Sequence, residues 1–222
     1  MKRLLYLLSL SLPWFLRRSI LRRVFKYEIA GDARIGFSWV MPERLIMGPR
    51  ARIGHLTICK GLELLEMGEQ AAIGNGCWIT GMPRSEARHF AHQRDSRRPR
   101  LRLGDHSAIT HRHIIDCTNS VEIGRFVTFA GYGSQVLTHS IDLDACRQSS
   151  EPVRIGDYCF VGTAVVILGG SVLPPFSVLG AKALLNKVFC EPYTLYAGIP
   201  ARPVQKIDRS AEYFRRTEGF IV

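Results

Sequence analysis

The sequence lacks the cysteine patterns that mark zinc sites and disulfide-rich domains. Its six cysteines form no C-x-x-C pair and no zinc-ligand spacing; they are Cys59, Cys77, Cys117, Cys146, Cys159 and Cys190. Four of them (59, 77, 117 and 159) stand among small and β-branched residues, which favours buried thiols and a reducing, cytoplasmic location. Charged residues make up 22% and hydrophobic residues 46% of the 222 positions, so wholesale disorder is excluded.

A long apolar run is also missing. The longest, residues 4–16, contains Pro13 and falls short of the roughly 20 residues that a spanning helix needs. No small-residue cleavage site follows it, which disfavours a signal peptide. After Pro13, apolar residues recur at helical spacing with arginines between them: Leu16, Ile20, Leu21, Val24 and Phe25 against Arg17, Arg18, Arg22 and Arg23.

This pattern predicts that residues 1–29 form a basic amphipathic segment, which contacts an anionic membrane surface through residues 1–26. Deleting residues 1–26 would then release the protein from membranes. The alternative is a helix that covers the end of the domain and packs its apolar face on the core.

Acidic residues are scarce in two stretches only. Residues 1–30 hold seven basic residues and one acidic residue, and residues 84–102 hold seven arginines and two acidic residues. These two stretches account for the whole formal net charge of +11. Local basic patches on a neutral body favour contact with an anionic surface or ligand, and no groove-reading motif supports nucleic-acid binding.

What the sequence does contain is a period of six. Large aliphatic residues follow one another at six-residue intervals at Ile155, Val161, Ile167, Leu173, Leu179 and Leu185, and the same frame occurs at Ile35, Met41, Met47 and Ile53. Ten of the twenty glycines directly follow an in-frame residue. Helices repeat near 3.6 and hairpin strands near 2, whereas short strands stacked as a parallel β-helix repeat at six. We therefore predict an all-β parallel β-helix whose glycines permit tight corners.

The six-residue frame breaks twice. The break at 82–100 is polar and basic, and is either a solvated excursion or a loop over an anionic acceptor or the lipid surface. The break at 137–152 contains Thr138-His139. The β-helix domain is thus expected over 30–207, followed by a short C-terminal extension over 208–222.

Residues 155–181 (IGDYCFVGTAVVILGGSVLPPFSVLGA) and 196–204 (YAGIPARPV) resemble the hexapeptide-repeat acyltransferases. The similarity is to the bacterial surface-polysaccharide O-acetyltransferases, alongside the galactoside and maltose O-acetyltransferases. It covers about residues 30–207 and implies a left-handed β-helix, a homotrimer, and acetyl transfer from acetyl-CoA to a sugar hydroxyl. With the basic N-terminus, it implies a glycan or lipid-linked acceptor at the inner face of the cell membrane.

The resemblance assigns the catalytic role to a histidine that follows a threonine in such a break, and His139, 16 residues before Ile155, matches. Histidine suits a general base because its unperturbed pKa is roughly 6.5. Asp142 or Asp144 could orient the imidazole, and the sequence does not choose between them.

The resemblance also implies a binding site for the donor. Small residues along which an extended pantetheine arm can run are Gly162, Ala164, Gly180 and Ala181. Lys187 and Arg202 match basic residues of the family that could neutralise the 3′-phosphate of coenzyme A. Two departures weaken the match: residues 185–188 read Leu-Asn-Lys-Val, and Phe160 stands where the family commonly has tryptophan.

Other histidines suggest alternatives. His111 and His113 could line the acceptor cleft, although packing or solvent exposure is the favoured explanation for both. Together with His106 they suggest a second alternative, a zinc enzyme like the γ-class carbonic anhydrases. Three histidines within eight residues lack the coil-related spacing of a facing triad, so no metal is expected. A non-catalytic β-helix scaffold at the membrane is the remaining alternative, and it would not need His139.

Overall fold

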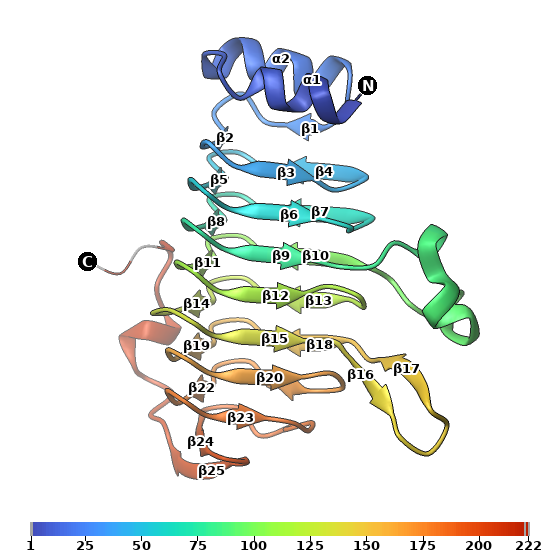
Figure 1. Cartoon of the computed structure of the whole chain (residues 1–222). Helices are drawn as coiled ribbons and strands as arrows, with labels where there is room; N and C mark the ends of the chain where they lie inside the picture. Colours follow the sequence, from blue (N-terminus) through green and yellow to red (C-terminus); the bar gives the residue numbers. More distant parts are fainter. Residues whose placement is uncertain (1, 220, 222) are drawn as a thin grey trace.

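The computed structural model describes residues 2–219 and 221, and its body is a left-handed parallel β-helix (Figure 1). Three parallel sheets form the faces of a triangular prism, and each coil of the chain contributes a short strand to each face. We name these faces A, B and C in the order in which the chain visits them.

Face A contains β1 (Glu28–Ile29), β4 (Arg44–Met47), β7 (Leu64–Met67), β10 (Arg100–Leu103), β13 (Val121–Ile123), β18 (Val153–Ile155) and β21 (Val172–Leu173). Face B contains β2 (Arg34–Ile35), β5 (Arg52–Ile53), β8 (Ala72–Ile73), β11 (Ala108–Ile109), β14 (Thr128–Phe129), β19 (Phe160–Val161), β22 (Val178–Leu179), β24 (Thr194–Gly198) and β25 (Ala201–Lys206). Face C contains β3 (Trp39–Met41), β6 (Ile58–Lys60), β9 (Trp78–Thr80), β12 (Ile114–Asp116), β15 (Gln135–Leu137), β20 (Val166–Leu168) and β23 (Leu184–Leu185). Outside the faces lie α1 (Lys2–Ser9), α2 (Trp14–Arg23), the 3-10 helices η1 (Arg84–Gln93) and η2 (Glu212–Phe214), and the hairpin β16 (His139–Asp142) and β17 (Arg147–Ser150).

The six-residue period is confirmed as the repeat of the coil. Ile155, Val161 and Ile167 occupy faces A, B and C of one coil, and all three side chains are buried. Parallel pairing sets Ile155 beside Leu173 and Val161 beside Leu179 in the next coil. The prism is thus filled by one large aliphatic side chain per strand and per coil, which dispersion and burial stabilise.

Met41 is an exception to the predicted frame. Strand β3 buries Val40 and turns Met41 outward, and Val40 pairs in register with Cys59 of the next coil. Val40 follows Ile35 by five positions, whereas the repeat requires six. The first coil therefore has a corner that is one residue shorter than the repeat.

The glycines that follow the in-frame residues serve close stacking of coils rather than a left-handed backbone, whereas other corner glycines such as Gly76 and Gly170 do have a positive φ. A Cβ atom on Gly104 would lie 2.6 Å from the backbone nitrogen of Arg125 in the next coil, closer than real atoms approach. The left-handed conformation occurs two residues later, at His106 with φ of 57°. Glycine therefore does stand at the predicted corners, but it is needed there for the close approach of the next coil and not for the backbone conformation of the turn.

The left-handed corner positions carry a column of stacked aromatic rings along the edge between faces A and B. Neighbouring rings have centroids 4.7 to 5.3 Å apart in the series His106, Phe126, Tyr158, Phe176 and Tyr193. The C-terminal segment returns along this column: Phe214 packs edge-on against Phe176 and Tyr193, and the Arg216 guanidinium lies over Phe126. Residues 208–219 are therefore packed against the β-helix.

Helices α1 and α2 cover the N-terminal end of the prism (Figure 1). The Tyr6 hydroxyl accepts a hydrogen bond from the Val40 backbone N–H (2.9 Å), and Arg17 donates to the Ser38 carbonyl (3.0 Å). Arg17, expected on the polar face, is instead 3% exposed because it satisfies carbonyls at the open edge of the first coil. Neither helix, nor any other in the described part of the chain, has the length and apolar character to cross a bilayer.

Cysteine burial follows the expectation. Cys59, Cys77, Cys117 and Cys159 lie in the interior, whereas Cys146 and Cys190 are exposed, and all six thiols are free.

Both interruptions of the frame leave the prism at the edge between faces C and A (Figure 1). The first follows β9 and contains η1, and the second follows β15 and is an antiparallel hairpin rather than an irregular loop. The intervening coil turns this edge without an insertion, through residues 116–120, and that corner is buried. The edge between faces C and A therefore gathers the candidate catalytic residues.

Candidate active site

His139 lies at the base of the hairpin, directly against the β-helix. It is the first residue of β16 and pairs with Ser150 of β17. Its imidazole Nδ1 lies 2.7 Å from Oδ2 of Asp116, the last residue of β12. The His139 side chain is 35% exposed and that of Asp116 is 9% exposed. One side of the imidazole therefore contacts a buried carboxylate, while part of the ring remains open to a substrate.

The Asp116 carboxylate is surrounded by hydrogen-bond donors. Oδ2 accepts from the backbone N–H groups of Thr138 (2.9 Å) and His139 (3.0 Å), and Oδ1 accepts from the Thr118 backbone N–H (3.0 Å) and hydroxyl (2.6 Å). Burial alone would raise the pKa of Asp116, but the hydrogen bonds, that from His139 foremost, lower it to about 2. The carboxylate is thus ionised at neutral pH, so Nδ1 of His139 carries a proton and donates it.

This tautomer leaves the lone pair of the neutral imidazole on Nε2. The hydrogen bond to Asp116 raises the pKa of His139 above its ordinary value, partial burial opposes the rise, and the carboxylate charge adds to it. A histidine held in this way accepts a proton on Nε2 and is stabilised once it is charged. That is the arrangement of a general base.

Asp142 and Asp144 do not orient His139, which corrects the sequence-based assignment. Asp142 accepts a hydrogen bond from the Ala145 backbone N–H (3.0 Å), and Asp144 is exposed in the turn of the hairpin. Both belong to the part of the hairpin that extends away from the prism, whereas the imidazole faces the coil. Asp116 was missed, and its signal is the polar run Asp-Cys-Thr-Asn-Ser at 116–120 between two buried strands.

The same buried corner holds the other strand of the hairpin. The Asn119 side-chain amide donates to the Ser150 carbonyl (3.2 Å), and the Asn119 backbone N–H donates to the Thr138 hydroxyl (3.0 Å). Because Ser150 pairs with His139 across the hairpin, both strands are fixed to one corner of the β-helix.

The basic 82–100 segment packs against this hairpin and is not merely a solvated excursion. Phe90 and Arg97 are fully buried, and the Phe90 ring lies 6.4 Å from the His139 ring with the two planes nearly perpendicular. The loop therefore forms part of the surroundings of the candidate base.

The predicted donor residues gather at another edge, between faces B and C. Gly162 and Ala164 follow β19, one coil beyond the coil that carries His139, and Gly180 and Ala181 follow β22, one coil further. Stacking also requires glycine here, because a Cβ atom on Gly162 would lie 2.6 Å from the Ala181 backbone nitrogen. The result is an edge with no side chain longer than a methyl group at these four positions.

The two basic residues predicted to bind the donor lie at different edges of the prism. Arg202 is exposed on β25 and pairs with Ala197, the residue that a Cβ atom on Gly180 would meet at 3.0 Å. Lys187 lies instead beyond β23 at the edge between faces C and A, where its carbonyl accepts from the Val172 backbone N–H (3.3 Å). Within one chain, Arg202 joins the small residues and Lys187 does not.

His111 and His113 are not brought together with His139 within the chain. His113 is buried, its Nδ1 accepts from the Ser134 backbone N–H (3.1 Å), and burial lowers its pKa to about 4. His111 lies on the edge between faces B and C, where its Nδ1 accepts from the Asn75 backbone N–H (2.9 Å). Among residues 2–219 and 221, no three His, Cys, Asp or Glu side chains are grouped to hold a metal ion.

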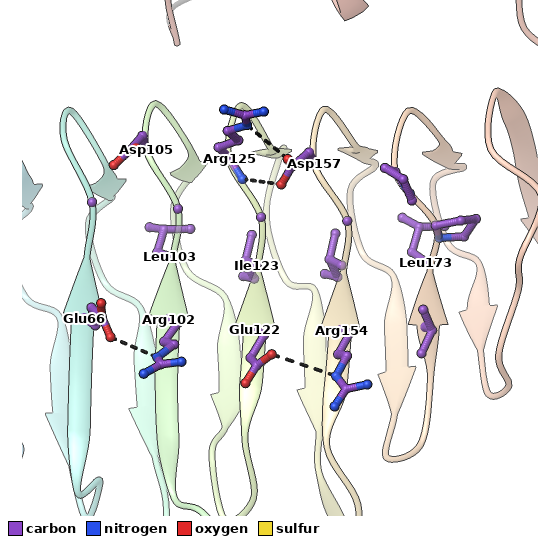
Figure 2. A pocket seen from close by; sticks show the side chains of 18 residues that line it. Glu66, Arg102, Leu103, Asp105, Glu122, Ile123, Arg125, Arg154, Asp157 and Leu173 are labelled. Atoms are coloured by element: carbon purple, nitrogen blue, oxygen red, sulfur yellow. Dashed lines mark hydrogen bonds and ion pairs between the residues drawn. The ribbon is translucent and has the colours of Figure 1, made fainter.

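A groove of about 630 Å³ lies on face A, and His139 is not among the residues that line it. Figure 2 shows the lining side chains. Its charged side chains pair with one another across the coils, including Glu66 with Arg102 (2.9 Å) and Arg125 with Asp157 (3.0 Å). Because these charges are already paired, the groove offers no concentrated charge of one sign to a ligand. We therefore place the candidate site at His139.

No family model matches the chain. A protein of Schizosaccharomyces pombe that is named as an acetyltransferase is 34% identical over 98 residues, which are 43% of this chain and 44% of that protein. The chain thus matches less than half the length of this relative.

Three solved structures share the fold at low identity. A hexapeptide-repeat acetyltransferase from Vibrio cholerae O1 biovar eltor, in complex with acetyl-coenzyme A, is 20% identical with a TM-score of 0.51, covering 91% of this chain and 84% of that one. The polysialic acid O-acetyltransferase OatWY is 16% identical with a TM-score of 0.55, covering 84% and 90%. A variant of AntD, an N-acyltransferase from Bacillus cereus in complex with dTDP and coenzyme A, is 12% identical with a TM-score of 0.54, covering 89% and 94%. The chain therefore has the left-handed β-helix of the hexapeptide-repeat acyltransferases.

Proposed function

We propose that this chain is an acetyl-CoA-dependent O-acetyltransferase. Its acceptor is a sugar hydroxyl in the biosynthesis of a bacterial surface polysaccharide such as capsule, exopolysaccharide or lipopolysaccharide. The observation that carries the proposal is the 2.7 Å contact between His139 Nδ1 and the buried Asp116 carboxylate, which leaves Nε2 as the proton acceptor. The shared fold and the name of the S. pombe relative support acyl transfer.

The geometry supports a direct transfer without a covalent enzyme intermediate. Nε2 of His139 takes the proton of the acceptor hydroxyl while the hydroxyl oxygen attacks the thioester carbonyl. Asp116 stabilises the imidazolium that forms. When the C–S bond breaks, the imidazolium gives its proton to the departing sulfur, so that the acetyl group rests on the sugar and His139 is again neutral.

The edge between faces B and C fits the donor. Gly162, Ala164, Gly180 and Ala181 provide a path parallel to the prism axis along which an extended arm can pair with backbone groups. Arg202 stands at the far end of this path, where it can neutralise a phosphate. Lys187 would contribute to a donor site only across a contact with another chain.

The replacement His139→Ala tests the proposed function. Turnover should fall by at least about a hundredfold, because a positioned base contributes roughly 10² to 10⁴. The control is His92→Ala, an exposed histidine in the neighbouring loop. Full activity in His139→Ala, or no binding of coenzyme A by calorimetry, would reject the enzyme and favour a scaffold.

We propose a homotrimer as the active form, since one chain does not complete the site. His139 lies on the edge between faces C and A, whereas the donor residues and His111 lie on the edge between faces B and C. Three prisms with face C turned toward a common axis would bring these two edges together from neighbouring chains. Face C suits burial because the column of residues along its outer side is apolar at every position but Gln135: Trp39, Ile58, Trp78, Ile114, Gln135, Val166 and Leu184.

A charge on this column tests the assembly. Ile114 is 44% exposed, so Ile114→Glu should leave the fold intact. Light scattering should show that the variant is a monomer, and it should have lost transfer activity. Arg154→Ala on face A is the matched control and should remain trimeric. A wild-type chain that is active as a monomer would refute the arrangement.

We also propose that the protein is cytoplasmic and lies peripherally on the inner face of the cell membrane. The inner side of the helical cap packs on the core, and its outer side exposes an apolar surface made of Leu4, Leu7, Leu8, Leu12, Phe15 and Leu16. Arg22, Arg23 and Lys26 are exposed beside it. Apolar side chains flanked by cations fit the interface of an anionic bilayer.

Deleting residues 1–26 is a poor test of this contact, because it would also uncover the first coil that Tyr6 and Arg17 close. The double variant Leu8→Glu/Phe15→Glu changes only exposed positions. It should no longer sediment with vesicles containing phosphatidylglycerol, whereas Leu143→Glu in the hairpin turn should still do so. If the wild-type chain does not sediment with such vesicles, the membrane contact is refuted and the acetyltransferase proposal is unaffected.

A further inference from the structure

Arg97 is a fully buried arginine whose Nη1 and Nη2 atoms donate to carbonyl groups and whose guanidinium lies against an aromatic ring, while its buried Nε has no hydrogen-bond partner among the described residues. Nη1 donates to the carbonyls of Thr118 (2.9 Å) and Met82, and Nη2 donates to the Pro83 carbonyl (3.4 Å). The guanidinium carbon lies 4.6 Å from the centroid of the Phe90 ring. Met82 and Pro83 begin the basic loop and Thr118 belongs to the buried corner, so Arg97 fastens the loop to the β-helix. Burying a cation is costly unless it is well bonded, and solubility alone would not require it.

Phe90 stands between this arginine and the candidate base. It is fully buried, and its ring makes a perpendicular contact with the His139 imidazole at a centroid distance of 6.4 Å. The imidazole is therefore held by Asp116 through Nδ1 and by Phe90 through packing. The Phe90 ring also excludes water from the part of the imidazole that it covers.

Gln93, at the end of η1, holds the strand opposite His139. Its Oε1 accepts from the Ser150 backbone N–H (2.9 Å) and hydroxyl (3.0 Å), and its Nε2 donates to the Ser150 carbonyl (3.2 Å). Ser150 is the residue that pairs with His139 in the hairpin. Three hydrogen bonds thus join the loop to β17, the strand that pairs with the strand of the base.

We propose that the basic loop over residues 82–100 is a positioning element of the active site. Phe90 and Gln93 hold the imidazole of His139 in its working orientation, and Arg97 seats the loop on the β-helix. The proposal rests on the role of His139 as the base. It assigns a specific role to a segment that the sequence left as either a solvated excursion or a loop over an anionic acceptor or the lipid surface.

A positioning role has a signature that a purely structural role lacks. The charged groups that face His139 are the Asp116 carboxylate on the coil and, behind Phe90, the Arg97 guanidinium. Partial burial now opposes the rise that Asp116 causes in the pKa of His139. Phe90→Ala admits water and weakens that opposition, so the pKa of His139 should rise and the acidic limb of the rate profile should move to higher pH.

The experiment uses the full-length chain with Phe90→Ala, Phe90→Leu and Gln93→Ala. Two readouts are measured: the pH titration of His139 by NMR, and release of coenzyme A from acetyl-CoA with a panel of p-nitrophenyl glycosides as acceptors. In Phe90→Ala and Gln93→Ala we expect kcat to fall about tenfold to a hundredfold with KM for acetyl-CoA nearly unchanged, because a small misplacement of a catalytic group costs this much. Phe90→Leu keeps an apolar shield and should recover most of both properties.

His92→Ala is the control, because its side chain is exposed on the same loop. If Phe90→Ala and Gln93→Ala keep the wild-type kcat and the wild-type titration of His139, while His139→Ala is inactive, the loop has no positioning role and the proposed function stands. If His139→Ala is itself as active as wild type, the proposed function fails together with this inference.

Discussion

Replacing Asp116 by asparagine tests the catalytic geometry most directly, because the side chain keeps its size and loses its charge. Asparagine has one side-chain oxygen. The Thr138 backbone N–H and the His139 Nδ1–H both donate to Oδ2, so the oxygen should occupy that position. The amide nitrogen must then face the backbone N–H and hydroxyl of Thr118, which donate to Oδ1 in the wild type. The variant therefore loses an acceptor as well as a charge.

The size of the effect follows from the His139–Asp116 contact. A hydrogen bond to a charged group contributes about 1.5 to 3 kcal/mol, and one pKa unit corresponds to about 1.4 kcal/mol. The lower end applies, because the imidazole is 35% exposed and solvent screens the pair. We expect the pKa of His139 to fall, and kcat to fall about tenfold because the imidazolium loses its carboxylate.

The sign of the pH effect is fixed by the wild-type arrangement. Asp116 raises the pKa of His139, so the base is free only above that raised value and activity is lost as the pH falls through it. In Asp116→Asn the acidic limb of kcat/KM should therefore move to lower pH, while the plateau is reduced. NMR titration of His139 measures the same shift without an acceptor.

Asp142→Asn provides the matched control, because Asp142 bonds within the hairpin and not to the imidazole. It should leave both the limb and the plateau unchanged. An Asp116→Asn variant with the wild-type limb, or an Asp142→Asn variant that shifts it, would refute the dyad that we describe.

Two further predictions concern the donor edge and the C-terminal segment. Arg202→Ala should weaken coenzyme A binding about tenfold in calorimetry and leave 3′-dephospho-coenzyme A unaffected, because only the former carries the phosphate that the guanidinium would pair with; equal losses for both ligands would place Arg202 elsewhere. Phe214→Ala should lower the free energy of unfolding by about 3 kcal/mol, since large-to-small core changes of this type cost about 3–5 and Phe214 lies at the margin of the core with 7% exposure. Its melting temperature should fall while the titration of His139 stays in place, and an unchanged melting temperature would contradict the packing on Phe176 and Tyr193.

The β-helix could be predicted from the sequence because its interior admits one large aliphatic side chain per strand. That constraint is local and periodic, so a run such as Ile155, Val161 and Ile167 reveals it without knowledge of the rest. The burial of Met41 was predicted wrongly, because a single shortened corner shifts the frame by one residue and turns this side chain outward.

The site was predicted only in part, because it depends on contacts between coils. His139 could be proposed from its place in an interruption, but Asp116 lies 23 residues earlier and meets it only through coil stacking. A nearby carboxylate such as Asp142 is the natural guess from sequence alone. Phe90 and Arg97 were hidden for a similar reason: their segment is polar on average, and burial of two particular side chains depends on what the loop packs against.

The helical cap also limits how copies of the chain can associate. The last strand of a parallel sheet has unpaired backbone N–H and C=O groups, to which a strand of another chain can bind. Repeated addition of this kind leads to fibres. Here β3, the first strand of face C, meets Tyr6 and Arg17. At the opposite end β25, the last strand of face B, reverses direction and carries Pro203, which has no N–H to offer an incoming strand. Addition of a further strand along the prism axis is thereby opposed at both of these strands.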